Sequence, residues 1–302
     1  MFFDISKANI EELQDDLFLQ KQVKVSILRL DKIHPLVSGN KIFKLHYFLK
    51  ETLTSKHKTI LTFGGAYSNH LAATAFACKA LQLNSIGIVR GEKPKFLSST
   101  LQQCIEDGMQ LKFITRHAYS KKDSTTFLNN LQTEFGDHNI VPEGGYHPLG
   151  AKGAALIGDL LKDKDYTHIC TASGTFTTVA GLLLSANVQQ TIMTVPILKG
   201  ISDTAERISY LTGKQLLLEQ LQILSTYHFG GYAKKSEQLI EFMNKVWMQH
   251  HLPLDFVYTA KMLYAIFDCI KNNYFKKGSE IICLHTGGLQ GNNSLSSKLI
   301  LY

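Results

Sequence analysis

Short apolar runs alternate with longer stretches of helical periodicity along nearly the whole chain. The apolar runs predict strands at residues 24–30, 59–63, 85–89, 111–115, 139–141, 167–171, 191–196, 222–226 and 280–284. The periodic stretches predict helices at residues 41–53, 69–81, 125–135, 149–161, 177–185, 236–249 and 260–272. Strands that are apolar on both faces and alternate with helices are typical of mainly parallel sheets covered on both sides. The pattern therefore predicts an α/β protein.

Composition excludes several classes of protein. Of the 302 residues, 44% are hydrophobic and 19% are charged, which is enough apolar material for a substantial core. No apolar run approaches the roughly 20 residues that cross a bilayer, and the first residues lack the features of a secretory signal. The cysteines are far apart, as expected of free thiols in a reducing compartment. We therefore expect a soluble, cytoplasmic protein without a membrane partner.

The basic residues are scattered rather than clustered, although the formal net charge is +7. A nucleic-acid-binding protein usually concentrates Lys and Arg in a stripe beside aromatic residues or on a recognition helix. The chain also lacks the Cys and His spacings of a zinc site. We therefore expect no nucleic-acid partner and no metal, whereas the mild positive field suits small anionic molecules.

The strand-to-helix junctions carry the candidate chemistry, because ligands of open α/β sheets bind at the carboxyl ends of the strands. The unusual junctions are residues 38–41, 64–70, 172–178 and 285–288. Segment 172–178 places a glycine and several hydroxyl groups at a helix start, where free N–H groups favour phosphate. Helix capping by Ser or Thr is the alternative role. The segment matches neither a P-loop nor a dinucleotide GxGxxG motif, which disfavours a Rossmann nucleotide-binding protein.

The other junctions suit a carboxylate and a reactive amine. Ser68 is a natural N-cap, and its hydroxyl and the N–H groups of Asn69 and His70 can bind a carboxylate. A serine hydrolase is excluded, because His70 stands where its GxSxG motif needs glycine. Lys41 opens a predicted helix, where the dipole disfavours a cation. The amine form that Schiff-base chemistry needs is favoured there.

Together these junctions resemble the pyridoxal-phosphate (PLP)-dependent family of 1-aminocyclopropane-1-carboxylate (ACC) deaminases and D-cysteine desulfhydrases, of the tryptophan-synthase-β-like fold type II. The resemblance rests on segments 39–45, 68–70, 173–178, 257–261 and 285–288. It implies PLP as cofactor, a small amino-acid substrate and a homodimer. It also implies two domains, each a mainly parallel twisted sheet with helices on both faces, and PLP in the cleft between them. Residues 1–45 plus 151–302 would form the larger domain, and residues 46–150 a smaller inserted one.

The resemblance also assigns roles to individual residues. Lys41 resembles the lysine to which the cofactor is covalently linked, and Asn69 the residue that hydrogen-bonds its phenolic oxygen. The implied catalytic residues are Lys41, Ser68, Tyr232 and Tyr258, although core packing is the alternative role for the tyrosines. The implied cofactor-binding residues are Lys41, Lys44, Asn69, Ser173, Gly174, Thr175, Thr177 and Thr259. The substrate carboxylate is implied to lie at Ser68, Asn69 and His70.

Departures from the family pattern bear on the reaction. Thr259 stands where the deaminases have a glutamate that pairs with the pyridine nitrogen, and His70 where they have glutamine. Both changes match the desulfhydrases. We expect the pyridine nitrogen to meet the Thr259 hydroxyl, with no carboxylate within reach. A hydroxyl supplies no full charge to hold a proton on that nitrogen. Phe43 replaces the usual arginine, and the segment between Gly91 and Gly108 is shorter than in well-known members.

The leading hypothesis is therefore a PLP-dependent lyase that performs α,β-elimination on a small amino acid, above all D-cysteine, to give pyruvate, ammonia and sulfide. Lys41 is the expected base for the α-proton on one face, and Ser68 or Tyr258 on the other. Deamination of ACC is the alternative reaction. Phe43 and the short segment also keep open a non-catalytic paralogue that binds PLP or another small molecule, and turnover would separate it from an enzyme.

Overall fold

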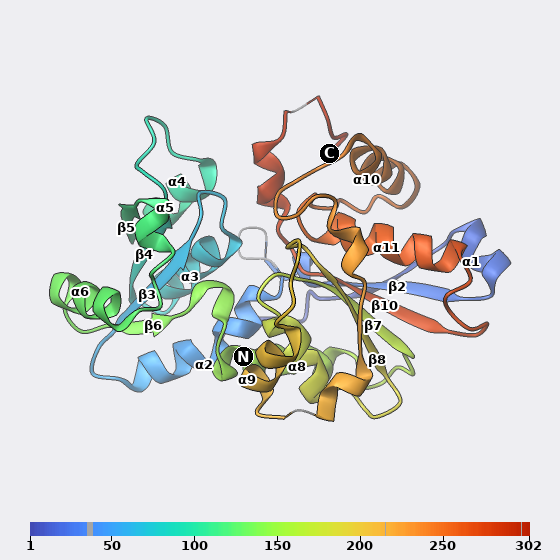
Figure 1. Ribbon diagram of the computed structural model, residues 1–302, viewed down its shortest axis with the longest axis horizontal. Coiled ribbons are helices and arrows are strands. Elements are labelled where there is room, and N and C mark those ends of the chain that lie inside the picture. Colours follow the sequence, from blue (N-terminus) through green and yellow to red (C-terminus); the bar gives the residue numbers. More distant parts are fainter. Residues whose placement is uncertain (35–38, 215, 297) are drawn as a thin grey trace.

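The computed structural model describes residues 1–34, 39–214, 216–296 and 298–302, and Ser38 of the first candidate junction lies outside these ranges. Two lobes lie side by side, each built around its own sheet (Figure 1). The predicted class, α/β with mainly parallel sheets in two lobes, is confirmed. The exact domain boundaries at residues 45 and 150 stay a prediction.

The larger sheet draws its strands from both ends of the chain. Its order is β1-β2-β10-β7-β8-β9. The strands span, in that order, Ile10–Leu13, Lys24–Arg29, Glu280–His285, His168–Ser173, Thr191–Pro196 and Leu221–Ile223. Strand β1 pairs antiparallel with β2, and the remaining neighbours are parallel. Because β10 pairs with both β2 and β7, the ends of all three strands meet at one edge of the sheet.

The smaller sheet is entirely parallel, with the order β5-β4-β3-β6. Its strands span Met109–Ile114, Asn84–Arg90, Thr59–Gly64 and Asn139–Val141. The helices of this lobe are α3 (Asn69–Ala80), α4 (Ser99–Glu106), α5 (Arg116–Tyr119) and α6 (Thr125–Phe135). The junction between β3 and α3 therefore stands at the carboxyl edge of a parallel sheet, where a ligand site is expected.

Helices cover both faces of the larger sheet (Figure 1). On one face lie α1 (Asp16–Lys21), α10 (Glu237–His250) and α11 (Thr259–Lys271), and on the other α7 (Pro148–Ala155), α8 (Thr177–Ser185) and α9 (Thr204–Thr212). Helix α2 (Lys41–Thr54) packs on α7 and also on α3 of the smaller lobe. Short 3₁₀ turns span Leu30–Lys32, Glu143–Gly145, Leu156–Leu160, Leu216–Gln220, Ser225–His228 and Leu289–Ser294.

The core follows the alternation of side chains along each strand. In β2, Val25 and Ile27 pack in the cluster with α10 and α11, whereas Leu28 packs in the cluster on the opposite face. Successive side chains of a strand point to opposite faces. This explains why the strand runs read as continuously apolar in the sequence.

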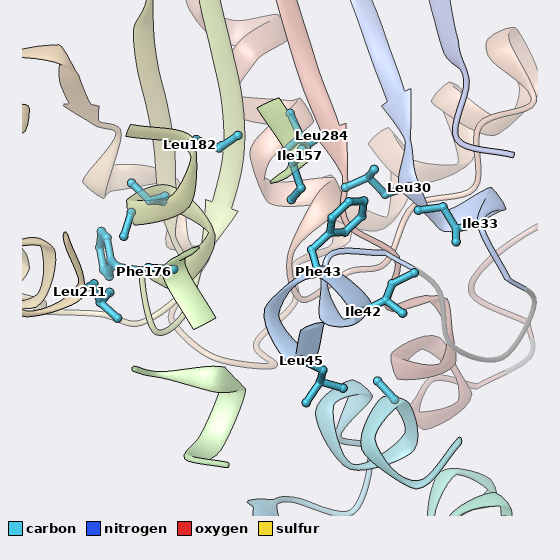
Figure 2. Close-up of a cluster of buried hydrophobic side chains, with 14 of the residues drawn as sticks. Leu30, Ile33, Ile42, Phe43, Leu45, Ile157, Phe176, Leu182, Leu211 and Leu284 are labelled. Carbon is cyan, nitrogen blue, oxygen red and sulfur yellow. The ribbon is translucent and has the colours of Figure 1, made fainter. Parts of the chain in front are cut away.

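Phe43 belongs to this core and not to the candidate site. Its side chain is fully buried. Figure 2 shows the ring directed toward Leu30, Ile157 and Leu284, in the cluster beneath the larger sheet. The loss of the family arginine at this position is therefore a change in core packing, and Phe43 gives no reason to expect an inactive paralogue.

The structure also bears on the predicted helix at 149–161, on the cysteines and, for the residues it describes, on the absence of long apolar helices. The predicted helix at 149–161 ends earlier, at Ala155, and continues as a 3₁₀ turn over Leu156–Leu160. All five cysteines are buried and unbridged. No helix in the described part of the chain has both the length and the apolar character to cross a membrane.

Candidate active site

The start of α2 packs against the backbone that follows the carboxyl end of β10. Gly39 has a φ of +84°, and a Cβ on it would lie 1.8 Å from the carbonyl oxygen of Thr286. Only glycine combines this conformation with such a close approach. Asn40 is buried beside it, and its Nδ2 donates to Thr178 Oγ1 at 2.7 Å. These contacts bring the first turns of α2 and α8 together.

Lys41 is the first residue of α2, and its Nζ donates to Asn40 Oδ1 at 2.9 Å. Burial lowers the pKa of Lys41 from 10.5 to about 8, and the charge of Asp255 opposes this shift. Because a lysine acts as a nucleophile or base only as a neutral amine, this environment suits the role that the sequence predicts for Lys41.

One of the predicted phosphate-binding residues, Thr175, lies close to a second buried lysine. Lys44 is buried, and its Nζ donates to the Gly144 carbonyl oxygen at 3.3 Å. A Cβ on Gly144 would lie 3.0 Å from Thr175 Cγ2, so Thr175 and Lys44 flank the same glycine. Thr175 Oγ1 lies 2.9 Å from Thr177 Oγ1, and Ser173 Oγ is buried without a hydrogen-bond partner among the described residues.

Lys44 forms no ion pair with any of the described residues. Burial lowers the pKa of Lys44 well below its ordinary value, and repulsion from Lys41 lowers it further. An anion beside Lys44 would reverse both effects, because it would stabilise the charged form. The hydroxyl groups of Ser173, Thr175 and Thr177 can donate to that same anion.

The second junction presents Ser68 and Asn69 at the start of α3. Ser68 caps the helix, and its Oγ accepts from Leu71 N at 3.2 Å. A Cβ on Gly64 would lie 2.5 Å from Ser68 Oγ, so the preceding glycine allows this tight turn. Asn69 Oδ1 is buried without a partner in the described chain. These groups and the free N–H groups of the first turn have the donors that an anion would need.

The His70 ring forms a hydrogen bond with Thr62, away from the first turn of α3. Its Nε2 lies 2.9 Å from Thr62 Oγ1, and that hydroxyl in turn donates to the Val141 carbonyl oxygen. Burial, with the charges of Lys41 and Lys44, lowers the pKa of His70 to about 3, so the ring is neutral. The predicted contact of His70 with a carboxylate would therefore come from its backbone N–H.

Gly288 links the two lobes at the site. Its φ is +99°, and a Cβ on it would lie 2.7 Å from Asn69 Nδ2 and 3.5 Å from Asp255 Oδ2. The residue thus lets the turn after β10 approach an amide from α3 on one side and a carboxylate from the larger lobe on the other. A larger side chain would push these groups apart.

A buried carboxylate, Asp255, lies beside Thr259. The expectation that no carboxylate comes within reach of the pyridine nitrogen stays a prediction. Thr259 Oγ1 donates to Asp255 Oδ2 at 2.7 Å, and both side chains are buried. The acid was missed because it precedes the predicted helix at 260–272 by five residues and looks like an ordinary capping residue. Its position beside Thr259 depends on a turn that the sequence pattern does not reveal.

The predicted tyrosines lie near this pair. A Cβ on Gly174 would lie 3.7 Å from the Tyr258 hydroxyl, so Tyr258 borders the predicted phosphate loop. Burial raises the pKa of Tyr258 well above its ordinary value, and the neighbouring Tyr232 and Asp255 raise it further. The pKa of Tyr232 is raised as well, by partial removal of its hydroxyl from water and by the charges of Glu143 and Asp255, although 45% of the residue stays exposed. Both phenols are therefore neutral, and can donate hydrogen bonds, at ordinary pH.

The chain is similar to proteins of known name and to solved structures. A Thermotoga maritima protein provisionally named ACC deaminase is 29% identical over 90% of this chain and 91% of its own. The mitochondrial bifunctional D-cysteine desulfhydrase/ACC deaminase of Arabidopsis thaliana is 29% identical over 84% of this chain and 70% of its own. The crystal structure of an ACC deaminase homologue matches with a TM-score of 0.83 at 24% identity, over 98% of this chain and 94% of that one. No protein-family model matches the chain.

Proposed function

We propose that this protein, a member of the family of PLP-dependent D-cysteine desulfhydrases and ACC deaminases, eliminates the β-substituent of a small amino acid. The substrate in this proposal is D-cysteine, and the products are pyruvate, ammonia and sulfide. The observation that carries the proposal is Lys41, an amine with a pKa lowered to about 8, beside a loop of hydroxyl groups suited to phosphate. Thr259 and His70, which match the desulfhydrases, support elimination over ring opening.

The residues present fit PLP. Buried polar atoms need partners, and Ser173 Oγ and Asn69 Oδ1 have none in the described ranges. A phosphate group would satisfy Ser173 and the charge of Lys44, and the Asn69 amide suits the phenolic oxygen, since its O and N atoms can exchange by a flip. When bound, PLP supplies an electron sink for negative charge at the α-carbon of the substrate.

Ser68 and the first turn of α3 would hold the substrate carboxylate. The Ser68 hydroxyl and the N–H groups of Asn69 and His70 stand at a helix N-terminus, which attracts anions. Binding there would orient the α-carbon between the two lobes. Tyr232 and Tyr258, as neutral phenols, can donate to the β-substituent or to the departing sulfur.

Lys41 Nζ, as a neutral amine, would take the α-proton of the substrate. The bond between the β-carbon and sulfur then breaks, the sulfur leaves with the electron pair as hydrosulfide (HS⁻), and a double bond forms between the α- and β-carbons. A proton from Lys41 or a tyrosine converts the hydrosulfide to hydrogen sulfide. One water molecule hydrolyses the released enamine to pyruvate and ammonia, so the atoms of D-cysteine and water are all accounted for.

Deamination of ACC is a second candidate, favoured by the names of the curated relatives and by the carboxylate beside Thr259. Asp255 brings negative charge close to the position where the deaminases have glutamate. That charge weakens the argument for elimination that rests on Thr259 alone.

Keto-acid formation from separate substrates tests the proposal. The purified protein would be incubated with PLP and with D-cysteine, L-cysteine, D-serine or ACC. We expect pyruvate and sulfide from D-cysteine faster than 2-oxobutanoate from ACC. A Lys41→Ala variant should lose turnover, whereas Lys50→Ala, an exposed position on the same helix, should keep it. Turnover of ACC with negligible elimination from D-cysteine would favour the second candidate.

A further inference from the structure

We propose that Asp255, acting through the Thr259 hydroxyl, keeps the ring nitrogen of the bound cofactor protonated. This inference rests on the proposed function, because it requires PLP to bind with its ring nitrogen at Thr259. It assigns Asp255 as a positioning residue, since its carboxylate acts through another side chain.

The Asp255 carboxylate has all of its acceptor positions filled. Oδ1 accepts from the N–H groups of Val257 at 3.0 Å and Tyr258 at 2.7 Å. Oδ2 accepts from the N–H of Thr259 at 2.9 Å and from its hydroxyl at 2.7 Å. A carboxylate offers about four lone-pair sites, so these donors leave no position for a proton. Burial raises the pKa of Asp255, but this set of donors opposes that effect and favours the ionised form.

The Thr259 hydroxyl is consequently an acceptor for any further partner. A hydroxyl has one proton and two lone pairs. The Thr259 hydroxyl donates to Asp255 Oδ2 at 2.7 Å, with the Asp255 carbonyl oxygen farther away at 3.3 Å, and the Asp255 N–H fills one lone pair from 2.8 Å. One lone pair remains. A hydroxyl in this state can accept from a protonated ring nitrogen but has no proton to donate to an unprotonated one.

A nearby cation would stabilise the buried negative charge of Asp255. Asp255 is fully buried and takes part in none of the ion pairs formed by the described residues. The charge of Asp255 also reaches Lys41 and Lys261, where it opposes the lowering of their pKa values by burial. The charge of His285 favours the ionised Asp255 carboxylate. A buried carboxylate with no cation in direct contact is costly, and a protonated ring nitrogen bound to the Thr259 hydroxyl would offset that cost.

Nitrogen-15 NMR of the protein loaded with ring-labelled PLP at a fixed pH tests this inference. The parent protein should give the upfield signal of a protonated pyridine nitrogen. Thr259→Val removes the hydroxyl but leaves the N–H donors of the Asp255 carboxylate in place, so the signal should move downfield to the unprotonated position. Thr259→Ser keeps the hydroxyl and should keep the upfield signal.

Asp255→Asn provides the second arm, because it keeps the shape of the side chain and removes the charge. It should also move the signal downfield. Tyr302→Phe is the matched control: it removes a hydroxyl bound to Leu254, next to Asp255, and should leave the signal unchanged. An unprotonated nitrogen in the parent, or an unchanged upfield signal in Thr259→Val, would overturn the inference. A parent protein that binds no PLP would overturn the proposed function as well.

Discussion

Lys261 Nζ donates to the carbonyl oxygen of Gly231 at 2.7 Å. The same nitrogen donates to the carbonyl oxygen of His228 at 2.9 Å, and the Lys261 side chain is fully buried. The loop between these carbonyls leads directly into Tyr232, and Gly230 and Gly231 in it have positive φ. From within α11, Lys261 thus fixes the loop that presents one of the predicted active-site tyrosines.

Replacing Lys261 with methionine should therefore destabilise the protein, because it leaves buried carbonyl groups without partners. We expect the free energy of unfolding to fall by about 1–3 kcal/mol for these lost hydrogen bonds. Lys271→Met, at the exposed end of the same helix, is the control and should change it by less than about 0.5 kcal/mol. Equal thermal unfolding of the two variants would show that Lys261 does not hold the loop.

Gly174 offers a graded test of the phosphate loop. A Cβ at this position would make only ordinary contacts, 3.7 Å to Tyr258 and 3.8 Å to Ile197, so alanine should fold normally. Valine adds bulk where the phosphate would approach the backbone. We expect Gly174→Val to weaken PLP binding at least tenfold, a cost of about 1.4 kcal/mol, with Gly174→Ala in between. Titration of the cofactor measures this, and equal affinity in all three proteins would remove the phosphate role.

The lowered pKa of Lys41 predicts how its reactivity depends on pH. Only the neutral amine reacts with acetic anhydride, and the neutral fraction grows as pH rises through the pKa. In cofactor-free protein, modification of Lys41 should therefore reach half its maximum near pH 8 and then level off. Exposed lysines should keep gaining reactivity toward the ordinary value of about 10.4. Peptide mapping at several pH values gives the profile, and a Lys41 rate still rising above that value would contradict the burial argument.

A second carboxylate at Thr259 should be poorly tolerated. Thr259 touches Asp255 Oδ2 at 2.7 Å, so Thr259→Glu would place like charges together in a buried site. Thr259→Gln has the same size without the charge and serves as the control. We expect the glutamate variant to be less stable than the glutamine variant by at least about 1 kcal/mol. Combining Asp255→Asn with Thr259→Glu should restore most of the stability that the glutamate variant loses relative to the glutamine variant. Denaturant unfolding of these three variants measures the effect, and a Thr259→Glu variant as stable as Thr259→Gln would show that Asp255 is not charged.

Much of the fold was predictable because buried parallel strands leave a plain signal. Strands apolar on both faces, such as Ile60 and Leu61 in β3, stand out from amphipathic helices. The elements missed are short or carry mixed patterns: β1 (Ile10–Leu13) contains two glutamates, and α4 (Ser99–Glu106) and α9 (Thr204–Thr212) are only a few turns long. The homodimer and the cytoplasmic location stay predictions.

The site was predictable only in part. Lys41, Ser68 and Asn69 stand at glycine-containing junctions that the sequence displays, and the structure places them beside the carboxyl ends of the strands. Asp255 and Lys261 were not found, because their roles depend on burial and on partners distant in the chain. From sequence alone, an acid before a helix is interpreted as a capping residue, and a lysine within a helix is interpreted as a surface residue.

Identifying the lysine that links the cofactor is the most direct test of the role proposed for Lys41. Lys44 and Lys261 are buried lysines with lowered pKa values, so a lowered pKa alone does not single out Lys41. Lys261 Nζ is held by two carbonyl groups, whereas Lys41 Nζ donates only to Asn40 among the described residues. The protein loaded with PLP would be reduced with borohydride, digested and mapped by mass spectrometry. We expect one phosphopyridoxyl adduct, on Lys41; an adduct on Lys44 or Lys261, or on no lysine, would show that Lys41 does not hold the cofactor.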